Sequence, residues 1–144
     1  MRLVLDTNVV VSALLWGGLP YQLLQFAVDG EVALYTSPVL VAELSEILVR
    51  PHFKERLANQ GTDPQAIAEL YRSFAFLVEP ASVPRVVPDD PDDDHVVACA
   101  VAARAHLIVT GDKHLLKLVG HQYIGIVTVG QAVTMARVGG IPQG

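Results

Sequence analysis

The chain has 144 residues, a mass of 15.5 kDa and a formal net charge of −5 at pH 7. This length predicts a single domain over residues 1–144, with a flexible C-terminal tail at about 139–144. Hydrophobic residues make up 51% of the chain and charged residues 17%, a composition that excludes intrinsic disorder. The negative charge argues against a general basic nucleic-acid binder, but not against an enzyme whose acidic residues hold metal ions.

Two features of the sequence predict where the protein works. No apolar run reaches the ~18 residues that a membrane span needs, and Asp6 interrupts the apolar start too early for a signal peptide. A single cysteine, Cys99, excludes an intrachain disulfide. We therefore expect a soluble, cytoplasmic protein with no membrane contact.

Apolar runs and turn residues predict strands and helices in alternation, which is typical of an α/β fold. In chain order we expect a strand at 3–5, helices at 8–15 and 20–28, a strand at 32–35, helices at 38–49 and 64–72, a strand at 74–78, a loop at 84–91, a buried apolar helix at 96–103, a strand at 107–109, a helix at 113–119, a strand at 124–129 and a helix at 131–137. Because helices separate the strands, right-handed crossovers should join them into a central parallel sheet of about five strands, flanked by helices.

Acidic residues stand where several of these elements begin or end. Asp6 and Asp112 each follow a strand, and parallel sheets bind ligands beyond the carboxyl ends of their strands, near a switch point in strand order. Glu43 lies beside the apolar arc of its helix, whereas Glu46 points farther out. Asp94 precedes the apolar helix. Taken alone, each acid also fits a helix cap, a first-turn residue or a solvated position.

Together these carboxylates predict a metal site. Several carboxylates at one sheet edge repel one another, and a divalent cation relieves this repulsion. Oxygen ligands suit Mg²⁺ or Mn²⁺, and one or two such ions activate water and stabilise a phosphoryl transition state. Asn8 and Thr110 could orient a carboxylate or a water, although both also fit turn and cap hydrogen bonds. Asp92 or Asp93 could assist the metal through water.

Four short segments, in this order and spacing, resemble the PIN domain: LDTN at 5–8, SP at 37–38 with EL at 43–44, DDD at 92–94 before an alanine-rich helix, and VTGD at 109–112. The resemblance is strongest to the branch described as toxin components of toxin–antitoxin systems, related to VapC toxins, and LVRPHF at 48–53 also resembles that branch. It covers about residues 2–130 and implies a Rossmann-like, three-layer PIN fold.

The resemblance also implies an activity and partners. It implies an endoribonuclease that hydrolyses RNA phosphodiester bonds with a water activated by Mg²⁺ or Mn²⁺. The catalytic and metal-binding quartet would be Asp6, Glu43, Asp94 and Asp112, with Asn8 and Thr110 as accessory polar residues. Homodimers and, for a toxin, inhibition by a small antitoxin protein are implied as well.

Other residues have a second interpretation. Candidate RNA contacts are Arg50, Lys54, Arg56, Arg72 and Arg85, although the sequence favours ordinary surface charges at these positions. Trp16 is expected at the edge of the core, although it could stack on a base. Cys99 is expected to be a small core residue rather than a nucleophile.

Two other functions remain as alternatives. A phosphatase of the haloacid-dehalogenase type needs a second aspartate two residues after the first, and Asn8 stands at that position. A zinc enzyme is not among these alternatives, because the five histidines show no zinc-ligand spacing. A non-catalytic binding module, or a phosphoryl-transfer enzyme of different specificity on the same fold, is the alternative to the ribonuclease.

Overall fold

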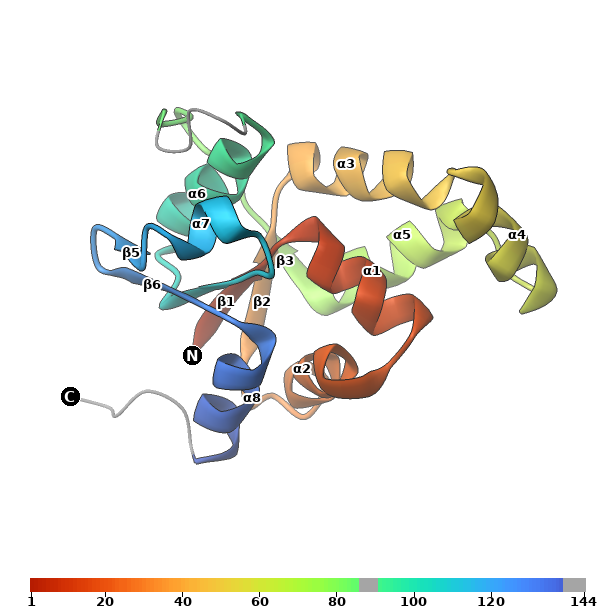
Figure 1. Cartoon of the computed structure of the whole chain (residues 1–144), viewed down its shortest axis with the longest axis horizontal. Helices are drawn as coiled ribbons and strands as arrows, with labels where there is room; N and C mark the ends of the chain where they lie inside the picture. Colours follow the sequence, from red (N-terminus) through yellow and green to blue (C-terminus); the bar gives the residue numbers. More distant parts are fainter. Residues whose placement is uncertain (86–90, 139–144) are drawn as a thin grey trace.

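The structure is a computed structural model that describes residues 1–85 and 91–138. The predicted tail at 139–144 and residues 86–90 of the predicted loop lie outside the described residues. The part described contains six strands and eight helices arranged as an α/β fold (Figure 1). The predicted fold class is thus confirmed.

A central sheet carries the fold. Its strands are β1 (Arg2–Leu5), β2 (Ala33–Thr36), β3 (Ala75–Leu77), β4 (Leu107–Val109), β5 (Gly120–His121) and β6 (Ile124–Val127). Their order across the sheet is β3-β2-β1-β4-β6-β5, and every neighbouring pair is parallel except β5 with β6. All five predicted strands are present. The short antiparallel β5 was missed, because two residues show no hydrophobic period.

The helices of the described chain are α1 (Thr7–Leu15), α2 (Gly18–Val28), α3 (Pro38–Leu48), α4 (Pro51–Asn59), α5 (Pro64–Phe74), α6 (Pro91–Ala103), α7 (Lys113–Leu116) and α8 (Val129–Arg137). All seven predicted helices are present, and α4 was missed. Pro51 was interpreted as a residue beyond the end of α3, but it occupies the first turn of a new helix, where its missing N–H costs nothing. The helix at α7 is shorter than predicted, because Val119 takes a left-handed φ of 61° before β5.

Side chains at the helix starts explain why the chain turns where it does. Ser37 caps α3 by accepting a hydrogen bond from the Leu40 N–H at 3.3 Å, and Asp63 caps α5 by accepting one from the Ala66 N–H at 2.9 Å. Thr128 at the N-cap and Gln131 at position N3 form a capping box at the start of α8. The predicted starts of α3 and α5 are therefore confirmed.

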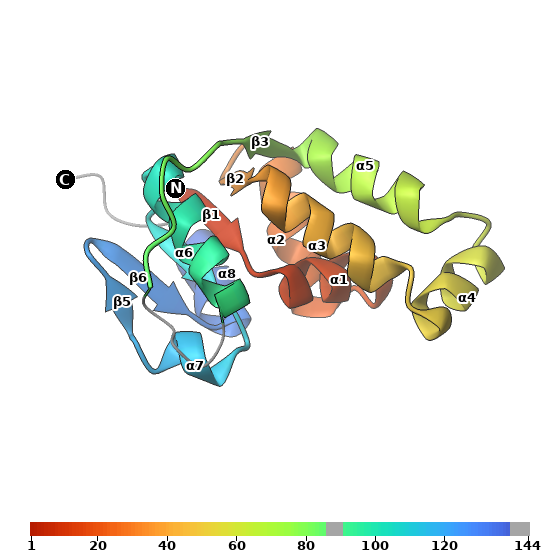
Figure 2. The same cartoon turned by 90° about the horizontal axis from the view of Figure 1, so that it is seen from above.

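Helices cover both faces of the sheet. The side chains of β1 alternate between two apolar clusters: Leu3 and Leu5 pack on the side of α1, α2 and α8, and Val4 packs against α6. Helices α3 and α5 lie side by side and extend away from the sheet, and α4 closes their far end (Figures 1 and 2). This arrangement gives three layers, with the sheet between two layers of helices.

The structure corrects the expected burial of helix α6 and bears on the expected absence of a membrane span. The predicted all-buried helix α6 buries most of its described side chains, but Val101 and Ala102 are exposed, because one side of a helix that covers a sheet faces water. No single helix in the described residues is long and apolar enough to cross a membrane, and α1 and α2 meet that criterion only as a pair bent by 93°.

Candidate functional site

The candidate site lies at the carboxyl edge of the sheet, where strand order reverses. Strand β1 has β2 on one side and β4 on the other. The strands that follow β1 in the sequence therefore lie first on one side of it (β2, β3) and then on the other (β4, β6, β5). Asp6 follows β1, and its N–H donates to the Val109 carbonyl at the end of β4 at 2.9 Å. This is the switch point at which open α/β sheets bind ligands. The predicted meeting of the Asp6 and Asp112 segments at one edge is therefore observed.

A buried threonine connects two of the predicted acids. Thr110 is fully buried, and its Oγ1 donates a hydrogen bond to Asp6 Oδ2 at 2.7 Å. The same oxygen accepts a hydrogen bond from the Asp112 N–H at 2.9 Å. One hydroxyl thus orients the Asp6 carboxylate and the backbone that carries Asp112.

The two acids differ in how they meet the following helix. Asp6 is the N-cap residue of α1, but its side chain makes no cap hydrogen bond, and its main-chain carbonyl accepts from Val9 and Val10 instead. Asp112 does cap α7, accepting from the His114 N–H at 2.7 Å. The cap interpretation is therefore wrong for the Asp6 side chain and correct for one oxygen of Asp112.

A compact group of potential ligands surrounds Asp112. One ligand atom each from Asp93, Asp112 and His114 lies within 4.8 Å of the others. Asp93 is 4% exposed, and His114 Nδ1 lies 3.7 Å from Asp112 Oδ1. Sequence reasoning left open whether Asp92 or Asp93 takes part. Asp92 is exposed, and Asp93 is the member of the run that lies in this group.

The other predicted site residues lie on elements around this group. Asp94 is 6% exposed in the first turn of α6, and Glu43 is half-buried on α3, while Glu46 is exposed as predicted. Helix α3 contacts both α1 and α6. Asn8 is exposed in the first turn of α1. Within the described residues, the compact group contains one member of the predicted quartet, Asp112, and does not contain Asp6, Asp94 or Glu43.

His114 is the residue that sequence reasoning set aside and the structure brings in. Its backbone and its ring both approach Asp112, because a two-residue spacing at a helix start places them together. The zinc-type spacing considered for the histidines concerns side chains on one helix. The signal that could have found His114 is its position two residues after a strand-end aspartate.

The remaining candidates separate into exposed and packed residues. Arg50, Lys54, Arg72 and Arg85 are exposed, whereas Arg56 is half-buried and donates to the Leu15 carbonyl at 3.0 Å. Cys99 is fully buried, and this burial raises the pKa of its thiol to about 12, with the nearby Ser37 side chain acting in the opposite direction. A thiol that stays protonated is a poor nucleophile, so the core interpretation of Cys99 is confirmed.

Comparison with known proteins identifies the family. The model of the PIN domain family matches residues 2–114. The chain belongs to the PIN domain family. PIN domains are generally metal-dependent nucleases, and the match spans β1, α3, α6 and the β4–α7 turn that carry the acids of this site. The predicted resemblance to this family is confirmed.

Relatives of the PIN domain chain include one curated protein and one solved structure. An uncharacterised protein of Methanocaldococcus jannaschii is 29% identical over 119 residues, which cover 82% of this chain and 75% of that protein. The structure of VapBC2 from Rickettsia felis, bound to a DNA fragment from their promoter, aligns with a TM-score of 0.60 at 14% identity, covering 89% of this chain and 98% of that one. At this identity the alignment shows a shared fold.

Replacing Thr110 with valine tests the hydroxyl bridge. Thr110→Val keeps the side-chain volume but removes the donor to Asp6 and the acceptor for the Asp112 N–H. We expect the free energy of unfolding to fall by about 1–3 kcal/mol, because buried polar groups lose hydrogen bonds. Urea denaturation in EDTA measures this change.

The matched control is Thr134→Val on α8. Its exposed hydroxyl donates to the Gly130 carbonyl at 3.0 Å, and we expect a change within about 0.5 kcal/mol. Equal losses of unfolding free energy for the two substitutions would show that the hydroxyl bridge between Asp6 and Asp112 stabilises the fold no more than an exposed hydrogen bond does.

Proposed function

We propose that this PIN domain protein is a divalent-metal-dependent endoribonuclease that hydrolyses RNA phosphodiester bonds. The observation that carries the proposal is the compact group of Asp93, Asp112 and His114 at the switch point between β1 and β4, where Thr110 also joins the Asp6 carboxylate to the backbone of Asp112. Asp6 and Asp93 are buried in a chain with few charged residues. Buried carboxylates need a compensating positive charge, which a bound cation supplies. PIN domains are generally metal-dependent nucleases, which agrees with this need.

The residues at the site fit a divalent cation. The Asp93 and Asp112 carboxylates offer the oxygen ligands that Mg²⁺ and Mn²⁺ prefer, and the His114 imidazole adds a nitrogen ligand that suits transition metals. In the proposed site these residues hold the cation, and Asp6, Asp94 and Glu43 complete the acidic shell. When bound, such a cation polarises a phosphoryl oxygen and generates a nucleophile from water at neutral pH.

The chain's own side chains position this acidic shell. Thr110 fixes the Asp6 carboxylate, and the His114 N–H fixes Asp112 Oδ1. Fixed carboxylates lose little conformational entropy when they bind a cation or a substrate, which favours the reacting geometry. Asn8, exposed beside Asp6, is proposed to contact the substrate or an ordered water at the open side of the site.

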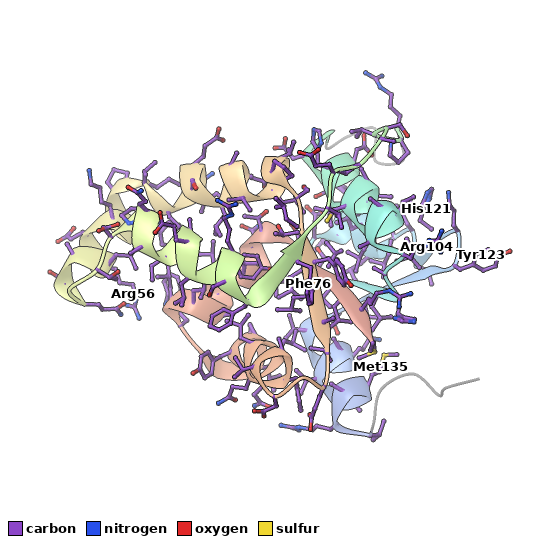
Figure 3. The ribbon with its side chains drawn as sticks, turned by 180° about the vertical axis from the view of Figure 1, so that it is seen from behind. Arg56, Phe76, Arg104, His121, Tyr123 and Met135 are labelled. Carbon is purple, nitrogen blue, oxygen red and sulfur yellow. The ribbon has the colours of Figure 1, made fainter. Side chains whose placement is uncertain are left out.

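We propose further that the protein is the toxin of a toxin–antitoxin pair, that it forms homodimers, and that an antitoxin protein binds it. The fold that it shares with VapBC2 supports the first and last parts. Strand β3 supports the second, because it is an edge strand of the described sheet and carries two exposed apolar side chains, Phe76 (labelled in Figure 3) and Leu77.

RNA cleavage tests the nuclease. Labelled single-stranded and structured RNAs are incubated with the protein in Mg²⁺, Mn²⁺ or EDTA, and we expect cleavage only with metal. Asp6→Asn and Asp112→Asn should reduce the cleavage rate roughly a hundredfold or more, because each removes a negative charge from the cation site. Asp29→Asn, an exposed acid in the α2–β2 turn, is the control and should keep full activity.

Three results would contradict this assignment. Cleavage that persists in both site variants would indicate a contaminating nuclease or a different site. Absence of both cleavage and metal binding would favour the non-catalytic module. A phosphatase or other phosphoryl-transfer activity without RNA cleavage would show that the substrate class is wrong.

Metal affinity distinguishes the neighbouring aspartates of α6. Asp93 lies in the compact group, whereas Asp92 is exposed. We expect Asp93→Asn to weaken Mn²⁺ binding, measured by calorimetry, by roughly tenfold or more, and Asp92→Asn to leave it nearly unchanged. Asp94→Asn in the same series measures how much Asp94, the acid that the resemblance to the family assigns to the quartet, contributes to Mn²⁺ affinity. Equal affinities of the Asp92 and Asp93 variants would refute the ligand role of Asp93.

Growth of a bacterial host tests the toxin proposal. Induced expression of the chain should arrest growth, and the Asp112→Asn variant at the same protein level should not, because arrest depends on cleavage. Normal growth with an active nuclease in the cell would assign the protein to RNA processing instead of toxicity.

A further inference from the structure

An aromatic and cationic cluster lies at the end of α1 that is farther from the acidic site. The Trp16 cluster consists of Trp16, Phe53 and Arg56. The Trp16 and Phe53 rings meet edge to face, with centroids 5.5 Å apart and planes at 84°. The Arg56 guanidinium carbon lies 4.8 Å from the centre of the Trp16 ring. The three side chains therefore form one contact unit between α1 and α4.

The cluster is held in place but remains open to solvent. Trp16 is 56% exposed, although a tryptophan in contact with a core would gain free energy from full burial. Arg56 is fixed by its hydrogen bond to the Leu15 carbonyl at 3.0 Å, and its Nε is buried with no hydrogen-bond partner among the described residues. A guanidinium held in this way fixes the indole ring, and the exposed part of that ring is suited to a planar ligand.

The cations of the chain favour an anionic ligand here. Three of the ten basic residues lie on or directly before α4, which carries one acid, Glu55, in a chain whose net charge is −5: Arg50 at the N-cap, Lys54, and Arg56 in the last turn. Arg50 and Lys54 are exposed. Backbone phosphates bind lysine and arginine, and bases stack on indole rings, so a cationic surface with an open aromatic ring matches single-stranded RNA.

Helix α1 fixes how far this cluster lies from the acids. Asp6 is the N-cap of α1 and Trp16 is its C-cap, so the two are separated by roughly 15 Å along the axis at 1.5 Å per residue. Figure 1 shows α1 leaving the strand ends and running toward the side of the molecule where α4 lies. About four or five stacked nucleotides at ~3.4 Å each cover this distance, and fewer do so when the strand is extended.

We propose that Trp16 is a base-stacking residue for single-stranded RNA. In this proposal, which rests on the proposed nuclease function, one base of the substrate stacks on the open face of Trp16 while a phosphate a few nucleotides away lies at the acidic site. Arg56 supports the ring from the other side, and Arg50 and Lys54 contact the intervening phosphates. The cluster then determines which single-stranded segments reach the acids.

Trp16 is the only tryptophan in the chain, so its fluorescence reports on this cluster alone. The full chain carrying Asp6→Asn, which is expected not to cleave, is titrated with short oligoadenylate and oligouridylate in Mg²⁺, so that the acidic site keeps its compensating cation. We expect quenching of Trp16 emission, stronger with oligoadenylate because a purine stacks over a larger area. Anisotropy of the labelled oligonucleotide measures binding independently of the tryptophan.

Substitutions distinguish stacking from a structural role. Trp16→Ala should weaken oligoadenylate binding roughly five- to a hundredfold, and Trp16→Phe should recover most of the affinity. Tyr123→Ala is the control: Tyr123 is fully exposed and lies on the opposite side of the molecule from Arg56 (Figure 3), so its removal should leave binding unchanged. Circular dichroism confirms that each variant is folded.

Three outcomes would overturn the proposal. Oligonucleotide binding with unchanged Trp16 emission would place the RNA elsewhere and leave the nuclease function intact. Equal affinities of a folded Trp16→Ala variant and the Tyr123→Ala control would make the cluster a packing element or a protein contact. Absence of both RNA binding and metal-dependent cleavage would refute the proposed function, and the stacking role with it.

Discussion

Asp6 and Thr110 are 104 residues apart in the chain, yet one hydrogen bond of 2.7 Å joins their side chains. That contact exists only because β1 and β4 are neighbours in the parallel sheet, with Leu5 opposite Val109 at their carboxyl ends. The pairing brings the residues after both strands to one edge, and the order reversal there leaves that edge uncovered. The acidic site depends on this pairing, which the hydrogen bond from the Asp6 N–H to the Val109 carbonyl continues just beyond the strand ends.

The site combines burial with like charge, which is an unfavourable combination without a cation. Asp6 and Asp93 are 4% exposed and Asp94 is 6% exposed, in a protein whose charged residues make up 17% of the sequence. Helix α6 contributes the partial positive charge of its N-terminus, which favours acids in its first turn. This contribution is small, so the proposed metal remains the main source of compensating charge.

In the proposed RNA-binding mode, helix α4 adds a second contact region at a fixed distance from the acids. Its Phe53 and Arg56 hold Trp16 at the end of α1, and α1 begins at Asp6. Because α1 is a rigid connection between the two regions, a substrate bound at both must span a defined length of chain. An overall negative protein can bind RNA in this way if its cations are local and its carboxylates are neutralised by metal.

The sequence by itself determined the α/β class, seven helices, five strands and the edge at which Asp6 and Asp112 meet, because hydrophobic period, caps and strand ends are local signals. It did not determine α4 or β5, since a proline begins helices as well as following them, and a two-residue strand has no period. Only the tertiary structure decided which aspartate of the run on α6 lies beside Asp112 and brought His114 into the group. Successive residues of a helix point about 100° apart, so their targets depend on how α6 packs on the sheet, and local sequence does not encode that angle.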